Sequence, residues 1–278
     1  MKVGFQGVAG AYSEQAIRQY FGPEAESVPV KALADLFLAV AGQDVDYGML
    51  PVENSVAGSV NQAYELLMEH DLRVYAEVVL RVRHMLLGVP GTDAASLQRV
   101  RSHPQALAQC QRYLARRGLV AEPAFDTAGA ARDLAASPEP GVAVIASEFA
   151  AELYGLEILD RQIEDYHFNY TRFFVLSVQD APRAQHSKTS LIFTVTHQPG
   201  ALYDCMGEFA KRRVNLTKIE SRPRLNRPWQ YIFYLDFEGH SQDPQCEAAI
   251  IGLLRRSSFV KLLGSYPAAT TPALDDEG

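Results

Sequence analysis

The chain has 278 residues, of which 47% are hydrophobic, and this length suggests one or two domains, each large enough to bury a core. A formal net charge of −7 disfavours nucleic acid or an anionic membrane surface as the main partner. The chain opens on a strand-like segment without a secretion signal, and it contains no apolar run of about 18 residues that could span a bilayer, so we expect a cytoplasmic protein.

Strand-like and helix-like segments alternate from the first residues to about Leu159. This alternation predicts an α/β fold in which crossovers join mostly parallel strands. The expected strands are Lys2 to Gln6, Tyr47 to Leu50, Val74 to Arg83, Met85 to Val89 and Val142 to Ala146. The expected helices are 13–21, 31–42, 56–70, 104–117 and 127–136.

Three segments with polar side chains lie where a predicted strand gives way to a predicted helix. In open α/β sheets, ligands bind at the carboxyl ends of strands. The first segment, residues 7–13, is glycine-rich and offers Ser13 as a helix cap. The second, residues 51–60, places Glu53, Asn54 and Ser55 together. The third, residues 102–107, has Pro104 at a first helical position and free N–H groups that would attract an anion.

A fourth segment, residues 169–174, begins a buried apolar strand. It sets the hydroxyl of Thr171 beside the cation of Arg172. Such a pair suits a reaction that protonates a leaving oxygen and holds a carboxylate. The segment from Val74 to Val89 is a suitable crossing into a second lobe, and a return between Asp160 and Tyr170 would bring this pair into a groove between the lobes.

The composition changes at residues 180–187, which are polar and without periodicity, and we place a domain boundary there. The order beyond it is βαββαβ, as in ferredoxin-like domains. Its strands are expected at Ser190 to Val195, Leu216 to Ser221, Tyr231 to Phe237 and Val260 to Gly264, and its helices at Ala201 to Lys211 and Gln245 to Arg255. Residues 268–278 are small and acidic and are expected to be disordered.

An RNA-recognition domain has the same βαββαβ order, and Tyr231, Phe233 and Phe237 alternate as stacking rings would. Asp236 and Glu238 would repel phosphate, so core packing is the favoured use of these rings. Three widely spaced cysteines, Cys110, Cys205 and Cys246, indicate buried thiols and neither disulfides nor a metal site.

Five motifs, taken together and in order, resemble the prephenate dehydratase family. They are GVAGAYSEQA at 7–16, PVENSVAGSV at 51–60, SHPQALAQC at 102–110, DTAGAA at 126–131 and NYTRFFVL at 169–176. The resemblance implies a two-lobed catalytic domain like type II periplasmic binding proteins, followed by an ACT regulatory domain. The implied domains are 1–182, with lobe one at about 1–78 plus 165–182 and lobe two at about 79–164, and 187–267.

The resemblance also implies the reaction, which converts prephenate to phenylpyruvate, water and carbon dioxide in phenylalanine biosynthesis without metal or other cofactor. Thr171 and Glu53 are the implied catalytic residues. The implied substrate-binding residues are Ser13, Asn54, Ser55, Ser102, Gln105, Thr127, Arg172 and Phe173. L-Phenylalanine would bind at Gly200, Ala201, Leu202, Asn215, Glu220, Ser221, Arg222 and Pro223, and the protein would form a homodimer or homotetramer.

Several uses of these residues stay open at this stage. Glu220 could receive the ammonium of phenylalanine or pair with Arg222, and His103 could be a helix cap or a catalytic group. Nothing in the motifs decides between prephenate and its aminated relative arogenate. A sensor that binds an aromatic acid without catalysis is a further alternative, because two-lobed α/β folds often serve only to bind.

Overall fold

The computed structural model describes residues 1–224 and 227–269, with the side chains of 224–230 left undescribed. The chain divides into two compact units. The first contains residues 1–63 and 78–173, and the second contains residues 64–77 together with those from Phe174 onward. The tail predicted to be disordered lies outside the described residues from position 270 on.

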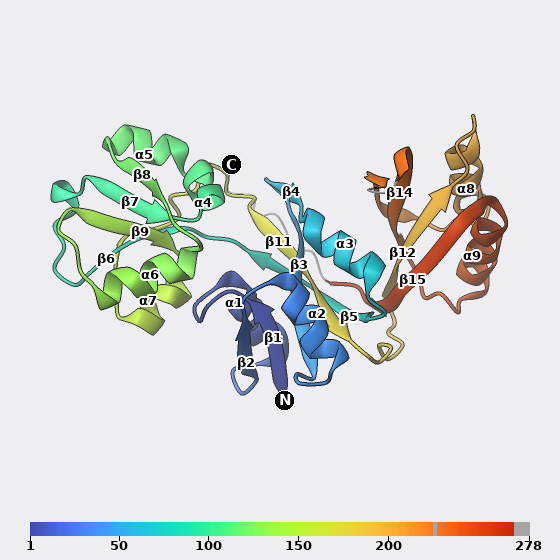
Figure 1. Cartoon of the computed structure of the whole chain (residues 1–278), viewed down its shortest axis with the longest axis horizontal. Helices are drawn as coiled ribbons and strands as arrows, with labels where there is room; N and C mark the ends of the chain where they lie inside the picture. Colours follow the sequence, from blue (N-terminus) through green and yellow to red (C-terminus); the bar gives the residue numbers. More distant parts are fainter. Residues whose placement is uncertain (225–226, 270–278) are drawn as a thin grey trace. The chain divides into compact units, whose positions relative to one another are not determined.

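The first sheet has the strand order β2-β1-β3-β11-β5, with β4 paired to β3 (Figure 1). Its strands are β1 (Lys2–Gln6), β2 (Glu26–Val30), β3 (Tyr47–Asn54), β4 (Gly58–Ser59), β5 (Arg73–Arg81) and β11 (Tyr170–Ser177), and its helices are α1 (Tyr12–Phe21), α2 (Leu33–Ala41) and α3 (Asn61–Glu69). Helix α2 buries Leu33, Leu36, Phe37 and Val40, the spacing of one helix face. It lies so close to the sheet that a Cβ on Gly4 or Gly48 would come within 2.8 Å of its side chains.

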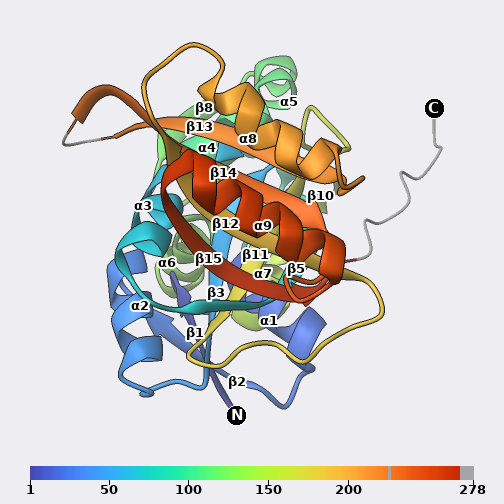
Figure 2. The same cartoon turned by 90° about the vertical axis from the view of Figure 1, so that its right-hand side faces the viewer.

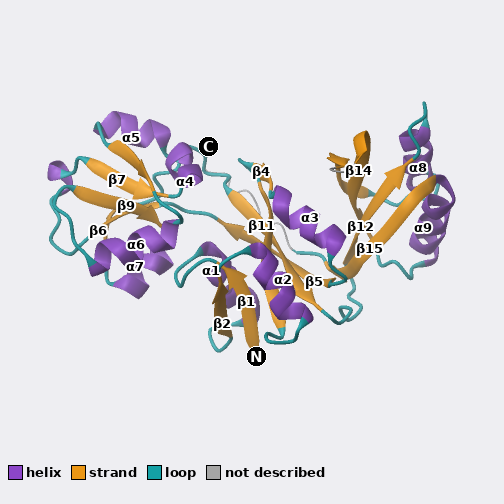
Figure 3. Cartoon of the chain, in the orientation of Figure 1, coloured by secondary structure: helices purple, strands orange, loops and turns teal. Residues whose placement is uncertain are grey.

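The second sheet has the order β10-β6-β9-β7-β8 and is covered by helices on both faces (Figure 3). Its strands are β6 (Met85–Gly88), β7 (Arg99–Ser102), β8 (Val120–Pro123), β9 (Val142–Ala146) and β10 (Glu157–Asp160). Its helices are η1 (Ala94–Ser96), α4 (Pro104–Gln109), α5 (Gln111–Arg117), α6 (Thr127–Ala136) and α7 (Glu148–Tyr154). Ala143 and Ile145 pack into the core with α4 and α5, whereas Val142, Val144 and Ala146 pack with α6 and α7. Burial on both faces explains why β9 is uninterrupted apolar sequence.

The C-terminal sheet is antiparallel with the order β13-β14-β12-β15, and α8 and α9 cover one face (Figure 2). Its elements are β12 (Ser187–Val195), α8 (Ala201–Ala210), β13 (Leu216–Arg224), β14 (Arg227–Glu238), α9 (Pro244–Arg256) and β15 (Ser257–Pro267), which is the predicted βαββαβ order. Phe233, Leu235 and Phe237 are buried in the core with these helices. Phe233 and Phe237 therefore serve core packing, which leaves only Tyr231 of the three rings exposed as a stacking surface would require.

Residues 64–77 contact the C-terminal sheet inside the second unit. The rings of Tyr64 and Tyr234 have centroids 4.6 Å apart. Lys261 Nζ donates to the carbonyl oxygens of Met68 and His70 at 3.1 and 2.6 Å. The second half of α3 and the start of β5 are thus packed with the βαββαβ elements.

Four local predictions are wrong. Strand β6 pairs antiparallel with both β10 and β9, so the second sheet is mixed and not mostly parallel; in the first sheet β4 pairs antiparallel with β3. The helix expected at 56–70 begins only at Asn61, because residues 54–59 form a hairpin. The helix expected at 104–117 breaks at Cys110, and α1 begins after Ala11, so Ser13 lies in its first turn and is not its cap.

The three cysteines are free and buried, as predicted. Among residues 1–224 and 227–269, no group of histidine, cysteine or carboxylate side chains is arranged to hold a metal ion. Within the same ranges, no helix is both long and apolar enough to cross a membrane.

Candidate active site

Thr171 lies at the start of β11, directly beside Asn54 at the end of β3. The Asn54 amide Nδ2 donates to Thr171 Oγ1 at 3.1 Å, to the Tyr170 carbonyl oxygen at 3.1 Å and to Asn169 Oδ1 at 2.7 Å. Asn54 and Asn169 are 7% and 1% exposed, so these bonds lie out of bulk water. The structure thus brings together the second and fourth motifs, as the sequence predicted.

The hairpin between β3 and β4 fixes the orientation of the Asn54 amide. Its Oδ1 accepts hydrogen bonds from the backbone N–H groups of Val56 and Ala57 at 3.1 and 2.8 Å, which is the geometry of an Asx turn. Gly58 closes the hairpin with φ of +82°, a conformation that favours glycine. Because Oδ1 faces the turn, Nδ2 must face Thr171.

Ser55 forms hydrogen bonds with the backbone that precedes Thr171. Its hydroxyl donates to the Phe168 carbonyl oxygen at 2.6 Å and accepts from the Tyr170 N–H at 2.9 Å. The Ser55 N–H also donates to the Tyr170 carbonyl oxygen at 2.9 Å. Ser55 therefore holds the start of β11 against the end of β3, and its hydroxyl is already engaged.

Gln109 is a site residue that the sequence analysis missed. It is 8% exposed, its Nε2 donates to Asn54 Oδ1 at 3.4 Å, and its Oε1 accepts from Asn169 Nδ2 at 3.0 Å. Helix α4 ends at this residue because Cys110 leaves helical geometry, and the Gln109 carbonyl oxygen accepts from the Asp165 N–H at 2.7 Å. In sequence, Gln109 was only one polar position within an expected helix.

His84 and Tyr12 continue the buried polar chain. His84 Nε2 lies 2.8 Å from Gln109 Oε1, and its Nδ1 lies 2.8 Å from the Tyr12 hydroxyl. Burial is the main cause that lowers the pKa of His84, and burial followed by the nearby Glu164 charge raises the pKa of Tyr12 well above its ordinary value. Both groups are therefore held neutral near pH 7.

Arg172 contacts Glu53. Arg172 Nη1 lies 3.8 Å from Glu53 Oε2, and the two side chains are 13% and 36% exposed. Thr171 and Arg172 thus each lie next to a residue of the second motif, Asn54 for Thr171 and Glu53 for Arg172.

The predicted residues Ser102, Gln105 and Thr127, which lie at β7, α4 and α6, differ in their surroundings. Ser102 is fully buried and donates to the Ile145 carbonyl oxygen at 2.6 Å, so its hydroxyl serves the sheet. Gln105 is exposed, and its N–H donates to His103 Nδ1 at 3.2 Å, which makes His103 a helix cap. Thr127 opens α6 and is half-buried.

Phe173 is only 1% exposed, so it offers a ligand almost no surface in this structure. Ser13 is 9% exposed in the first turn of α1. Neither side chain faces open solvent.

The glycine-rich loop of the first motif is bound by α7. Ser147 Oγ donates to the Gly10 carbonyl oxygen at 3.1 Å, and the Tyr154 hydroxyl donates to the Ala9 carbonyl oxygen at 2.6 Å. A Cβ on Gly10 would approach the Ala150 backbone to 3.3 Å, so this glycine permits the close contact. The loop between β1 and α1 therefore lies directly on α7.

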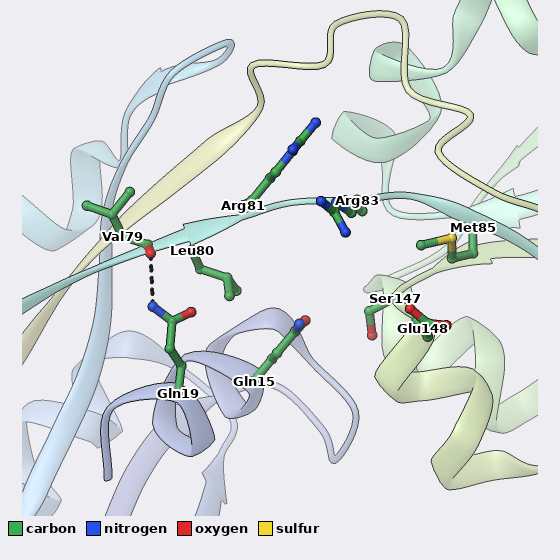
Figure 4. Close-up of a pocket in the computed structure, with 9 residues that line it drawn as sticks. All are labelled: Gln15, Gln19, Val79, Leu80, Arg81, Arg83, Met85, Ser147 and Glu148. Carbon is green, nitrogen blue, oxygen red and sulfur yellow. Dashed lines mark hydrogen bonds between the residues drawn. The ribbon is translucent and has the colours of Figure 1, made fainter. Parts of the chain in front are cut away.

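A cavity of about 300 Å³ opens beside these elements (Figure 4). It is lined by Gln15, Gln19, Val79, Leu80, Arg81, Arg83, Met85, Ser147 and Glu148, which come from α1, β5, the link between β5 and β6, β6 and the start of α7. Gln19 Nε2 donates to the Val79 carbonyl oxygen at 3.1 Å, and Arg81 points away from the two glutamines (Figure 4). None of the predicted catalytic or substrate-binding residues lines this cavity.

The predicted effector segments fall into two places in the second unit. Gly200, with φ of +82°, begins α8, and with Ala201 and Leu202 it lines a cavity of about 290 Å³ that also contacts Tyr231 and Phe233.

The other predicted effector residues lie on β13 or just before it. Glu220 pairs with Arg222 at 2.6 Å and with Lys218 at 3.2 Å, which realises one of the two uses foreseen for Glu220. Asn215, Ser221 and Pro223 are exposed.

Comparison with known proteins gives a consistent family. Residues 3–181 match the family model described as prephenate dehydratase. The chain is 42% identical over 282 residues to an arogenate dehydratase/prephenate dehydratase from Arabidopsis thaliana, covering 98% of this chain and 74% of that protein. A solved prephenate dehydratase from Arthrobacter aurescens in complex with L-Phe is 30% identical, with a TM-score of 0.88 over 98% of this chain and 93% of that one.

One similar structure has a different description. GqqA, described as a novel type of quorum quenching acylase, is 38% identical and has a TM-score of 0.88 over 97% of this chain and 98% of that one. The same fold is therefore associated with two descriptions of activity, and the chemistry of the site has to distinguish between them.

Proposed function

Since the chain belongs to the prephenate dehydratase family and is a dehydratase of the lyase class, we propose that it converts prephenate to phenylpyruvate under inhibition by L-phenylalanine. Prephenate carries a ring hydroxyl and a ring carboxylate. The electron pair of the breaking carbon–carboxylate bond enters the ring as the carbon–oxygen bond breaks, which releases carbon dioxide and forms the aromatic ring. Hydroxide leaves poorly, so a proton must reach the departing oxygen.

The hydrogen bond from Asn54 to Thr171 carries the proposal. Because Thr171 Oγ1 accepts the Asn54 amide hydrogen, its own hydrogen can be directed to another acceptor, and the bond polarises the hydroxyl. We assign that acceptor as the leaving oxygen of prephenate. A threonine hydroxyl is too weakly acidic to be a proton reservoir, so water or Glu53 resupplies the proton while Thr171 positions it.

The two carboxylates of prephenate need different electrostatic environments. The departing carboxylate reacts faster where it is poorly solvated, so a cation belongs on the other one, on the pyruvyl arm. We assign Arg172 to that arm. In the substrate complex Arg172 would share its guanidinium between Glu53 and the carboxylate, since a guanidinium has donors for both. Asn54 and Ser55 hold the geometry of the site.

For regulation, we assign the βαββαβ elements as an ACT domain and the cavity at Gly200 to Leu202 as part of the phenylalanine site. The opening turn of α8 offers N–H groups to a carboxylate, and Tyr231 and Phe233 offer an apolar wall for a ring. The Arthrobacter relative was solved in complex with L-Phe, which supports phenylalanine as the ligand. We expect a homodimer or homotetramer.

Arogenate is the second candidate substrate, because the Arabidopsis relative is described as acting on both compounds. Acylase chemistry is less well supported by the site. Amide hydrolysis by covalent catalysis needs a nucleophile next to a base. Asn54 contacts Thr171 as a hydrogen-bond donor and not as a base. Burial raises the pKa of the Cys110 thiol far above its ordinary value, so this thiol is not an activated nucleophile.

One panel of substrates tests the proposal. The purified chain is incubated separately with prephenate, arogenate and an acylated homoserine lactone, and the products are followed by chromatography. We expect phenylpyruvate from prephenate at the highest kcat/KM. A higher kcat/KM with arogenate would make arogenate, and not prephenate, the substrate. Turnover of the lactone alone would reject the dehydratase assignment.

A further inference from the structure

The buried side-chain amides next to Thr171 form hydrogen bonds whose donors and acceptors are fixed by two backbone N–H groups. Asn54 Oδ1 accepts from the N–H groups of Val56 and Ala57, so this atom is the oxygen of the amide. Asn54 Nδ2 is then the donor to Thr171 Oγ1 and to Asn169 Oδ1. Any change that rotates this amide would present an acceptor to Thr171 and draw its hydrogen away from the substrate.

The donors and acceptors of Asn169 and Gln109 follow from those of Asn54. Since Asn169 Oδ1 accepts, its Nδ2 donates to Gln109 Oε1 at 3.0 Å. Gln109 Oε1 is therefore an acceptor, and His84 Nε2 faces it at 2.8 Å. Two acceptors at that distance would repel, so Nε2 must carry a hydrogen.

On the other side of the imidazole, the Nε2–H tautomer leaves Nδ1 bare and so requires the Tyr12 hydroxyl hydrogen to reach it. That hydroxyl lies 2.8 Å from Nδ1 and donates at 2.8 Å to the Arg83 carbonyl oxygen, so its one hydrogen is shared between two acceptors and the tautomer is assigned from Gln109. The His84 backbone N–H donates to Glu164 Oε2 at 2.9 Å, and the Ile163 N–H donates to the His84 carbonyl oxygen at 3.0 Å. His84 is 2% exposed, so bulk water cannot replace a donor lost from this position.

We propose that His84 is a positioning residue for the dehydration: its Nε2–H holds the Gln109 amide, which with Asn169 keeps Asn54 donating to Thr171. The inference rests on the proposed function of Thr171. His84 itself touches no reacting atom. Its loss should act on turnover, because the geometry it maintains matters most when the leaving oxygen takes its proton.

A matched pair of substitutions tests the role. The amide nitrogen of His84→Gln can occupy the place of Nε2 and restore a donor, whereas His84→Met has similar length and no donor. We expect His84→Met to lower kcat at least tenfold with KM changed less than threefold, and His84→Gln to keep kcat within about threefold. Parental kcat in His84→Met, or equal losses in both variants at equal thermal stability, would overturn the proposal.

The unsubstituted protein gives a second test that does not depend on activity. With ¹⁵N-labelled histidine, long-range proton–nitrogen NMR distinguishes the two neutral tautomers, and the His84→Gln spectrum identifies the signal. We expect Nε2 protonated and Nδ1 bare between pH 7 and 8. An Nδ1–H tautomer would overturn the inference, even if prephenate turnover supports the proposed function. If the chain lacks dehydratase activity while the expected tautomer is found, the proposed function fails.

Discussion

The orientation of the Asn54 side-chain amide decides whether the Thr171 hydroxyl can donate its hydrogen to the substrate. An oxygen that receives a hydrogen bond from Asn54 is free to donate its own hydrogen, and the donor is held by two backbone N–H groups of the hairpin. This preorganised arrangement costs no rearrangement when negative charge develops on the leaving oxygen. The function proposed for Thr171 therefore depends on a neighbour 117 residues earlier in the chain.

The first prediction concerns Thr171. Thr171→Ala removes the donor and should lower kcat by about 10² to 10³ while KM changes little, because the bond is made to the developing charge. Thr171→Ser retains the hydroxyl and should keep much of the activity. Steady-state kinetics with prephenate measures both. An alanine variant with kcat within a few fold of the parent would remove Thr171 from the mechanism.

The second prediction concerns Arg172. Lysine cannot reproduce the bidentate fork of a guanidinium, so Arg172→Lys should raise KM for prephenate about tenfold or more, with a smaller change in kcat. Arg132→Lys, on the exposed surface of α6 where Arg132 pairs with Asp133, is the matched control and should leave both constants unaltered. Equal saturation curves for the Arg172→Lys variant and the parent would contradict the assignment of Arg172 to the pyruvyl carboxylate.

At the scale of elements, the sequence predicts best where burial is regular. Strand β9 and helix α6 have the predicted bounds, since one is apolar on both faces and the other begins after the cap Asp126 and ends before Ser137. The predictions at 56–70 and 104–117 are wrong for a different reason. An Asx turn at Asn54 and a backbone break at Cys110 are single-residue events that hydrophobic periodicity does not report.

The site was predictable only in part. The hydroxyl of Thr171 and the polar cluster at Asn54 were visible in sequence, because a strand end followed by polar residues marks a binding edge. Gln109 and His84 were not visible as site residues, since their roles come from contacts made across the fold.

The third prediction concerns Glu208 on α8. Its carboxylate pairs with Arg212 at 2.8 Å and Arg256 at 2.7 Å, and hydrogen bonds from these two groups lower its pKa. A lowered native pKa contributes stability above the ordinary value of about 4.3 and loses it as pH falls through the native value. Glu208→Gln should lower Tm at pH 7 by a few degrees, and the difference should shrink between pH 5 and 3.

Thermal unfolding at several pH values measures this difference. Glu24→Gln, at an exposed position after Pro23, is the control and should match the parent throughout. A difference between the Glu208→Gln variant and the parent that grows as the pH falls would contradict the sign of the argument.

At the scale of the whole molecule, the βαββαβ elements share a compact unit with residues 64–77. Tyr64 and Leu67 are 2% and 1% exposed, and Arg73 Nη1 donates to the Leu262 carbonyl oxygen at 3.1 Å. A truncation near Asp180 would strip partners from this segment, so we expect such a protein to fold poorly. Point substitutions are the better test of regulation.

The fourth prediction concerns Tyr64. Its ring centroid lies 5.4 Å from Lys218 Nζ and 5.7 Å from the Arg222 guanidinium, on the strand that carries Glu220. Helix α3, which holds Tyr64, begins at Asn61, immediately after the hairpin that orients Asn54. If effector binding shifts β13, Tyr64 transmits the shift. Tyr64→Leu should therefore keep turnover without effector within a few fold and raise the inhibitory concentration of L-phenylalanine about fivefold or more.

Inhibition curves with prephenate as substrate measure this response. Tyr20→Leu, on α1 with 41% of the tyrosine exposed, is the matched control and should retain the parental curve. Unaltered inhibition in the Tyr64→Leu variant would show that coupling takes another route.

The most direct measurement follows prephenate, phenylpyruvate and carbon dioxide together in one reaction at neutral pH, with the parent and Thr171→Ala proteins side by side. We expect the parent to consume prephenate and to release phenylpyruvate and carbon dioxide in a 1:1:1 ratio. The Thr171→Ala protein, folded to the same Tm, should be slower by about 10² to 10³. If prephenate disappears no faster with folded parent protein than in the protein-free control, the chain is not a prephenate dehydratase.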